Sequence, residues 1–440
     1  MVDLAAAFQH LKEKNVLVLG DFMCDLYTIG KANRISPEAP VVVLNVIEEK
    51  MLAGGAGNVV FNLHSLGAKV HPVGVLGEDT QGSALCDLFN QKGIATNGIF
   101  KSSKIQTIVK NRMIVDHQQL LRVDYEKKYS LDKDLEFLII DYIQSILKNF
   151  DVVAISDYQK GFLTSNILKS TIEKANNLNI PVVIDPKGKD FSKYQGATII
   201  KPNSKEAYIA ANIEEVFPIE TVADELLSKN YSKEWIITRS ENGMSYFTNN
   251  KRQNFPVKVK EVVDVTGAGD TALAMITFCV ANKLKTEEAI SLANIASSIA
   301  IEKIGCAHVS LSEIADRLLE YDTNDKFLSI DQIEIFKRII VSVPYVLFYI
   351  EKVEKFDFSI LENLKIKLKE YPDSKKIVFI EDHSQASLIS QVLSSFLDLD
   401  FIITDGNFLE ALLSISTPKK IEKISKCCSS VFYEGQVIKN

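Results

Sequence analysis

Short apolar runs rich in β-branched residues alternate along the chain with longer segments of helical hydrophobic period. This alternation is typical of β-α-β units, which build a parallel sheet with helices on its faces. The runs expected to form buried strands are Asn15–Leu19, Val152–Ile155, Pro181–Ile184, Thr198–Ile200 and Trp235–Thr238. The pattern therefore predicts an α/β fold whose central, mostly parallel sheet is flanked by helices.

Polar residues stand at the ends of these runs. They are Asp21, Asp157, Asp185, Asn203 and Arg239. Because open α/β sheets bind ligands at the carboxyl ends of their strands, these residues are candidates for one shared site. For any one of them, the alternative is that it is polar only because loops are polar.

Two segments, 41–49 and 107–125, alternate with a period of two and lack a helical period. In the second, Asp116 and His117 are expected to form the turn of a hairpin. Such strands suit a small sheet apart from the main one, which would act as a lid over the site. Isolated β-ribbons are marginal in water, so we expect the lid to form a homodimer contact as well.

The sequence becomes polar at 321–326, which predicts a linker. Beyond it, further strands alternate with helical segments, as expected for a second, smaller α/β domain. These strands are Val346–Ile350, Lys376–Ile380, Asp400–Thr404 and Ser430–Tyr433. With 440 residues, two domains are the prior expectation, and we place them at 1–320 and 327–440.

Composition narrows the class of ligand. The chain is 46% hydrophobic and 24% charged, with a net charge of -7, which argues against a nucleic-acid or anionic-membrane partner. No apolar stretch approaches the roughly 18 residues that span a bilayer, and the first residues lack a secretory signal pattern. The six histidines and six cysteines show no zinc-ligand spacing. We expect a soluble, cytoplasmic protein that acts on a small molecule.

The segment Asp264–Thr271, DVTGAGDT, carries the strongest chemical signal and precedes a helical run at 272–283. Small residues at Gly267, Ala268 and Gly269 let backbone N–H groups approach an anion at the start of a helix. Asp270 at that helix start is placed to accept a proton from an attacking hydroxyl. The plainer alternative is that Asp270 only caps the helix.

The whole octapeptide resembles the signature of the PfkB carbohydrate kinases of the ribokinase type. The sequence GGAGN at 54–58, with Asn62 and LGA at 66–68, resembles the sugar-binding glycine motif of that family, and Gly74 with GEDTQG at 77–82 matches its next block. The resemblance covers about residues 12 to 315. It implies a ribokinase-like fold, ATP as phosphoryl donor, Asp270 as base, an anion hole at 267–269, and sugar contacts at Gly54 and Gly55.

Within that family the chain is most similar to the D-glycero-β-D-manno-heptose 7-phosphate kinases. The similar blocks are RISPEAPV at 34–41, HQQLLR at 117–122, SDYQKG at 156–161 and DPKGKDF at 185–191, with Gln159 where glycine is more usual. The similarity implies phosphorylation at O1 in the synthesis of the lipopolysaccharide precursor ADP-heptose. The alternatives are a PfkB kinase for another sugar and a non-catalytic sugar-phosphate sensor, which the intact signature disfavours.

A substrate that carries a phosphate needs fixed cations. The candidates are Arg34, Lys110, Arg112, Arg122, Lys160 and Lys187, each of which can equally be a solvated surface charge. The candidates for holding sugar hydroxyls are Asp25, Asn58, Asp157 and Asp185.

For the nucleotide, the resemblance identifies an N-x-x-E motif at Asn203, Ser204, Lys205 and Glu206. Asn203 and Glu206 would hold Mg²⁺, mostly through water. The residues implied to lie beside ATP are Thr238, Arg239, Gly243, Thr266 and Asn294, together with KIGCA at 303–307. Asn294 can equally be a satisfied polar residue inside a helix.

Bifunctional relatives of these kinases carry a nucleotidyltransferase domain with an H-x-G-H motif after the kinase. The present chain has no H-x-G-H, and His383 is its only histidine beyond His308. The C-terminal third is therefore expected to be either a degenerate transferase or an unrelated α/β module, without transferase activity in either case.

Overall fold

The computed structural model describes residues 4–322 apart from 116–117, 259–261 and 304, and shorter pieces beyond 322. Those pieces are 327–328, 336, 345–350, 369, 375–380, 399, 401–403, 420–424, 430–433 and 436–439. The predicted turn at 116–117, most of the predicted linker, and His383 lie outside the described residues.

The chain divides into two compact units, residues 10–310 and residues 4–9 with 311–440. The change between units therefore comes at Ser310, before helix α10 (Leu311–Asp322), whereas the sequence pattern placed the end of the first domain at 320.

The main sheet of the first unit has nine strands in the order β13-β12-β11-β10-β9-β8-β1-β4-β5. Neighbouring strands are parallel except in the pairs β11–β12 and β12–β13, which are antiparallel and lie at one edge. The strands are β1 (Asn15–Gly20), β4 (Lys69–Gly77), β5 (Ile99–Ser102), β8 (Val152–Ser156), β9 (Val182–Asp185), β10 (Ala197–Ile200), β11 (Ser232–Thr238), β12 (Met244–Thr248) and β13 (Lys251–Phe255). The predicted mostly parallel sheet is confirmed.

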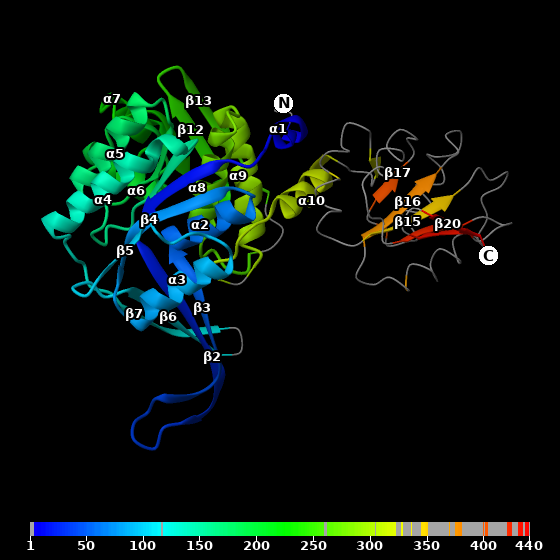
Figure 1. The fold of residues 1–440 in the computed structure, drawn as a ribbon, viewed down its shortest axis with the longest axis horizontal. Helices are drawn as coiled ribbons and strands as arrows, with labels where there is room; N and C mark the ends of the chain where they lie inside the picture. The colour runs from blue at the N-terminus through cyan, green and yellow to red at the C-terminus, as the bar shows by residue number, and fades with distance from the viewer. Residues whose placement is uncertain are drawn as a thin grey trace. The chain divides into compact units, whose positions relative to one another are not determined.

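Helices cover both faces of this sheet (Figure 1). One layer contains α2 (Ala56–Ser65), α8 (Ala268–Ala281) and α9 (Thr286–Ala300). The other contains α4 (Lys133–Ile146), α5 (Ser165–Asn177), α6 (Ser204–Ala211) and α7 (Ile219–Ser228). Helix α3 (Thr80–Gln91) follows β4, and single 3₁₀ turns lie at η1 (Leu147–Asn149), η2 (Ser192–Tyr194) and η3 (Ser240–Asn242).

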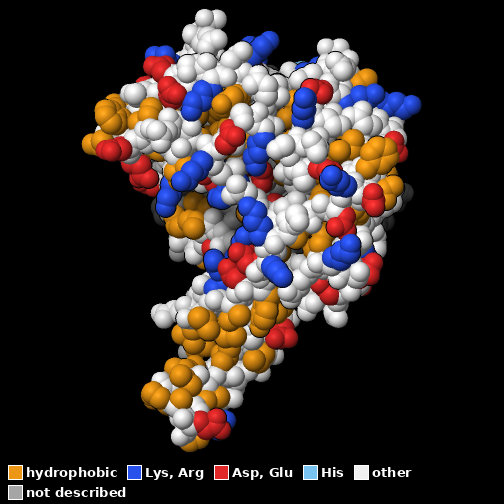
Figure 2. Space-filling model, turned by 90° about the vertical axis from the view of Figure 1, so that its left-hand side faces the viewer, with side chains coloured by type: hydrophobic (Ala, Val, Ile, Leu, Met, Phe, Trp, Pro, Cys, Tyr) orange, Lys and Arg blue, Asp and Glu red, His pale blue; other side chains and the backbone are white. Residues whose placement is uncertain are grey.

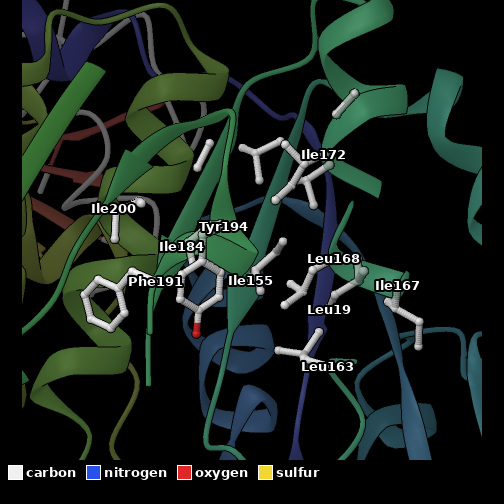
Figure 3. Packing of buried hydrophobic residues seen from close by; sticks show 14 of the residues in the cluster. Leu19, Ile155, Leu163, Ile167, Leu168, Ile172, Ile184, Phe191, Tyr194 and Ile200 are labelled. Carbon is white, nitrogen blue, oxygen red and sulfur yellow. The ribbon is translucent and has the colours of Figure 1, made fainter. Parts of the chain in front are cut away.

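Burial on both faces explains why the strands appear as continuous apolar runs rather than alternating ones. Leu19 and Ile155 pack against Leu168 of α5 in one cluster, as Figure 3 shows. Val16 and Val18 point to the opposite face of β1 and are equally buried. The two apolar layers hold the carboxyl ends of the strands in a fixed arrangement.

A separate four-stranded sheet, which we call the lid, has the order β3-β2-β6-β7. Its strands are β2 (Phe22–Ile35), β3 (Val42–Gly55), β6 (Ile108–Val115) and β7 (Gln118–Tyr125). The β6–β7 hairpin agrees with the predicted strands at 107–125, and β3 extends the predicted strand at 41–49. Strand β2 is new, and it pairs with both β3 and β6. The outer parts of β2 and β3 project from the unit as a two-stranded ribbon (Figure 1).

The second unit contains a seven-stranded sheet in the order β14-β17-β16-β15-β18-β19-β20. Its first five strands are parallel, and β19 and β20 are antiparallel additions. Its described elements are α1 (Leu4–Gln9), α10, β14 (Phe327–Leu328), β15 (Tyr345–Ile350), β16 (Lys375–Ile380), β17 (Phe401–Ile403), β18 (Lys420–Ile424), β19 (Ser430–Tyr433) and β20 (Gln436–Lys439). Among the described residues of both units, no helix is long and apolar enough to cross a membrane.

Candidate active site

The carboxyl ends of four adjacent strands and the start of α8 enclose a cavity of about 190 Å³. Its lining comes from the ends of β8, β9, β10 and β11, as the strand-end pattern predicted. The lining residues are Asp157, Tyr158, Asp185, Pro186, Lys187, Lys201, Asn203, Glu206, Thr238, Gly267, Gly269 and Asp270. Asp21 is not among them. Its buried carboxylate accepts the N–H groups of Tyr158 and Lys160, so it shapes the loop after β8.

Asp270 lies in the first turn of α8 and is 5% exposed. Its Oδ2 accepts a hydrogen bond from Asn58 Nδ2 at 3.0 Å, and its Oδ1 accepts one from Tyr158 OH at 2.7 Å. Burial raises the pKa of Asp270 to about 7, while the two hydrogen bonds favour the charged form and oppose the rise. A carboxylate that titrates near neutral pH is suited to accept a proton and release it again.

The turn before Asp270 requires glycine at Gly267. This residue has φ +83°, and an added Cβ would lie 2.6 Å from Asn58 Nδ2. The backbone N–H groups of Gly269 and Asp270 belong to the first turn of α8, so they have no acceptor within the helix, whereas the Ala268 N–H donates to Val265 O at 3.4 Å. Gly269 and Asp270 line the cavity, and the partial positive charge at this helix start favours an anion there.

Lys201 is a buried cation in the same cavity, and the sequence pattern gave no reason to select it. It is 2% exposed, and its Nζ lies 3.0 Å from Asp185 Oδ2. Burial raises the pKa of Asp185 to about 6, and the ammonium of Lys201 opposes that rise. The pair puts a fixed positive charge close to the α8 amides.

The Asn203–Glu206 segment forms a capping box at the start of α6. Asn203 Oδ1 accepts the Glu206 N–H at 2.9 Å, and Glu206 Oε2 accepts the Asn203 N–H at 2.9 Å. The other Glu206 oxygen lies 2.6 Å from Lys187 Nζ. Among the described residues, no group of three or more His, Cys, Asp or Glu side chains could hold a metal ion.

Ser204, Arg239 and Asn294 were also predicted to contact ATP. Ser204 Oγ donates to Thr238 O at 3.2 Å, and Arg239 donates to Ser245 Oγ at 2.9 Å. Ser204 and Arg239 also line an open depression of about 600 Å³. Asn294 is buried, and its Nδ2 donates to Phe255 O at 2.9 Å.

Other predicted nucleotide contacts occupy varied surroundings. Gly243 has φ +75°, Lys205 is exposed, and the N–H of Thr266 donates to Asp264 Oδ1 at 2.9 Å. The second oxygen of Asp264 accepts the N–H of Gly305 at 2.9 Å. Asp264 thus ties the turn before Asp270 to the segment that follows α9.

On the lid side, Asp25 is buried and forms an ion pair with Arg112 of the neighbouring strand. Cys306 Sγ lies 3.2 Å from the other Asp25 oxygen. A side chain at Gly54 would collide with this carboxylate, and Gly55 has φ +56°, so both positions require glycine. The guanidinium of Arg112, a candidate for binding the substrate phosphate, is thus paired with the Asp25 carboxylate.

The other basic candidates do not form one cluster. Lys110 Nζ lies 6.0 Å from the centroid of the Tyr158 ring. Lys160 pairs with Glu126, and Arg122 pairs with Asp124 on its own strand. Arg34 is exposed on the outer part of β2. Asp157 accepts hydrogen bonds from Lys193 Nζ, Tyr194 OH and the Gln159 N–H, all within the protein.

Comparisons with known proteins agree with this geometry. The model of the pfkB family carbohydrate kinases matches residues 13–313. The "Bifunctional protein HldE" of Pelobacter propionicus is 41% identical over 333 residues, covering 74% of this chain and 68% of that protein. The protein of the same name from Trichlorobacter lovleyi is 43% identical over 310 residues, covering 70% and 63%. The chain thus matches about two thirds of the length of these relatives.

Solved structures agree in fold. Phosphofructokinase-2 from Escherichia coli, in complex with potassium, has a TM-score of 0.59 at 19% identity, covering 70% of this chain and 99% of that one. Ribokinase from Arabidopsis thaliana, complexed with ribose and ATP, has a TM-score of 0.53 at 19% identity, covering 67% and 94%. The predicted ribokinase-like fold is confirmed. With a cavity formed at the matching signature, the chain belongs to the PfkB family of carbohydrate kinases and is an ATP-dependent sugar kinase.

Proposed function

We propose that this kinase transfers the γ-phosphoryl group of ATP to O1 of D-glycero-β-D-manno-heptose 7-phosphate, giving the 1,7-bisphosphate for ADP-heptose synthesis. The observation that supports the kinase chemistry is the buried Asp270 carboxylate at the start of α8, in one cavity with the cation of Lys201. The heptose assignment rests on the four similar sequence blocks and on the similarity to the relatives named "Bifunctional protein HldE".

In the reaction, Asp270 accepts the proton of the acceptor hydroxyl as that oxygen attacks the γ-phosphorus of ATP. The bond to the bridging oxygen breaks, and ADP leaves with the electron pair. The backbone amides at 267–269, at the start of α8, together with Lys201, stabilise the negative charge on the phosphoryl group in flight. The proton on Asp270 is then lost to solvent, which restores the base.

We further propose that Asn203 and Glu206 hold Mg²⁺ through water. The ion supplies neutralisation of phosphate charge when it is bound. Both side chains keep their oxygens near the cavity, and Lys187 beside Glu206 adds a cation on the nucleotide side.

For the 7-phosphate, we propose Lys110, which lies on strand β6 of the lid with its ammonium 6.0 Å from the centroid of the Tyr158 ring. Arg112 is already paired with Asp25, so we assign it to orienting Asp25 toward the sugar hydroxyls. Arg34 and Arg122 are exposed on the lid and are left as candidates for the far end of the substrate.

The lid also supports a proposal about assembly. Its outer ribbon carries exposed apolar side chains, which gather on the projecting part of the molecule in Figure 2. They include Ile35, Val41, Val42, Val46 and Ile47. An exposed apolar surface of this kind favours a protein contact, and we propose a homodimer through the lid.

The proposed domain roles follow the same reasoning. We assign sugar-kinase activity to the first domain and no transferase activity to the second, since the chain lacks H-x-G-H. The parallel strands β14 to β18 suit a degenerate nucleotidyltransferase-like module, with an unrelated α/β module as the alternative. The proposed compartment is the cytoplasm, where ATP and sugar phosphates are present.

The deciding experiment measures ATP turnover by the full chain on heptose 7-phosphate, fructose 6-phosphate, ribose, fructose and mannose. We expect heptose 7-phosphate to give the highest kcat/KM. A higher value on another sugar would replace the heptose assignment with that sugar, and the absence of turnover on the whole panel would favour the sensor.

A further inference from the structure

A chain of buried polar side chains runs behind Asp270 and has no part in the reaction as described above. Asn58 and Asn62 lie one turn apart on α2, and both are 1% exposed. Asn62 Nδ2 donates to Asn58 O at 3.0 Å and to Asn58 Oδ1 at 3.1 Å. Asn62 Oδ1 in turn accepts the N–H of Val309 and the hydroxyl of Thr271, each at 3.3 Å.

The direction of these hydrogen bonds is fixed by the backbone. The Val309 N–H can only donate and the Asn58 carbonyl can only accept, so the Asn62 amide satisfies both groups in only one orientation. That orientation presents a donor to Asn58 Oδ1. The Asn58 amide must then turn its own Nδ2 toward Asp270, where the bond of 3.0 Å lies.

Tyr158 completes the arrangement from the opposite side. Its hydroxyl donates to Asp270 Oδ1 at 2.7 Å, and its own N–H is held by Asp21 at 3.0 Å. Each Asp270 oxygen therefore accepts one buried hydrogen bond and keeps a lone pair for the proton of the substrate.

We propose that Tyr158, Asn58 and Asn62 are positioning residues that hold the Asp270 carboxylate in one orientation and stabilise its ionised form. The proposal rests on the assignment of Asp270 as the base. Hydrogen bonds to the charged form of an acid favour that form, and a bond to a charged group is roughly twice as strong as a neutral one. Without either donor, Asp270 should ionise only at higher pH.

The test compares pH profiles of kcat/KM for the full-length wild type, Tyr158→Phe and Asn62→Leu. We expect the midpoint of the acidic limb to move up by about one pH unit in Tyr158→Phe, the effect of losing one charge-assisted hydrogen bond, and by a smaller amount in Asn62→Leu, where the Asn58 donor remains but its orientation is no longer fixed. The loss of activity in Tyr158→Phe should be about tenfold near pH 6, and in both variants it should largely disappear at pH 9, where the base is ionised in all three proteins. Tyr246→Phe is the matched control, because Tyr246 OH donates to Glu234 instead, and its midpoint should not move.

A uniform loss at all pH values with an unchanged midpoint would overturn the proposal, because that result describes damaged packing. A second measurement does not depend on activity. The thermal midpoint of each protein is compared with that of its Asp270→Asn derivative between pH 5 and 9. Since burial raises the pKa of Asp270 above its unfolded value, its contribution to stability is present at low pH and is lost as the pH rises through the folded pKa.

The pH at which this loss ends should lie near 7 in the wild-type background and higher in the Tyr158→Phe and Asn62→Leu backgrounds. An identical end point in all backgrounds would count against the proposal. Failure of the base assignment looks different, because Asp270→Asn would then retain activity whatever the end points are.

Discussion

The cavity around Asp270 and the outer ribbon of the lid belong to the same unit, but the first buries polar side chains and the second exposes apolar ones. In the cavity, Asp270, Asn58 and Lys201 are buried and each is bonded to another side chain. On the ribbon, Ile35 is 68% and Ile47 is 66% exposed. The chemistry requires fixed distances, so the polar atoms of the cavity hold one another. On the ribbon, the backbones of β2 and β3 pair with each other while these apolar side chains are left exposed.

The largest expected effect comes from removing the proposed catalytic base in the cavity. Asp270→Asn should lower kcat by about 10²–10⁴-fold, the usual range for loss of a general base. The amide can still accept from Asn58 and donate to Tyr158, so the fold should persist. Because a buried charge is removed, the variant should unfold at a higher temperature than wild type at pH 8. Steady-state kinetics and thermal unfolding check both results, and a kcat above half of the wild-type value would remove Asp270 from the role of base.

The second largest effect is expected from a change in the substrate. Removing the 7-phosphate from the substrate should lower kcat/KM by at least about a hundredfold, since two or three charge-assisted hydrogen bonds are lost. Part of the loss should appear in kcat, because binding at the remote phosphate orients O1 near Asp270.

Lys110→Gln sharpens this prediction. We expect it to lower kcat/KM roughly tenfold or more for heptose 7-phosphate and to change the value for free heptose little. Measuring kcat/KM of the wild type and of Lys110→Gln on both sugars gives the coupling free energy between the Lys110 side chain and the 7-phosphate. An equal loss on the two sugars would show that Lys110 does not contact the phosphate.

A smaller effect on activity is expected from the ribbon. Ile47→Glu places a charge on the exposed apolar surface, so sedimentation at micromolar concentration should change from dimer to monomer, with a several-fold loss of activity. The matched control is Phe137→Glu on α4, since Phe137 is 69% exposed but lies outside the lid. A wild-type protein that sediments as a fully active monomer would contradict the proposed contact.

The smallest effect concerns Gln159, which adopts φ +58° between the two regions. Gln159→Gly should stabilise the first unit by about 0.5–1 kcal/mol, because a left-handed conformation is strained for glutamine and not for glycine. Asn179→Gly, at φ +55°, should gain less, since asparagine tolerates this conformation. Thermal unfolding of the two variants checks the order, and a loss of stability in Gln159→Gly would mean that its side chain contributes more than the strain costs.

The sequence predicted the parallel sheet, the β6–β7 hairpin and the place of Asp270, because each depends on local period or on a contiguous motif. Strand β2 was missed because it begins only one residue after β1 ends and has buried side chains on both faces at its start. Lys201 and Tyr158 were missed for a different reason. A lysine or a tyrosine at a strand end is ordinarily a surface or core residue, and only the fold brings these two beside Asp185 and Asp270.

The hydrophobic pattern of the sequence also could not predict the pairing of Arg112 with Asp25. Both residues were selected from the sequence as substrate contacts. The register of β2 against β6 places Tyr27 opposite Arg112, and the guanidinium of Arg112 pairs with Asp25. A sequence gives residue types and periods, whereas the register between strands far apart in the chain depends on the whole sheet.

The hydrogen bond between Asn58 and Asp270 joins residues that are 212 positions apart, and the contact between Asp25 and Cys306 joins residues 281 positions apart. Contacts of such long sequence separation form late during folding, because the loops between them must close first. In refolding from denaturant, helical circular dichroism should therefore recover before catalytic turnover does. During that interval the chain is compact but inactive, and the apolar side chains of the outer ribbon are exposed. The yield of active enzyme should therefore fall as the protein concentration during refolding increases.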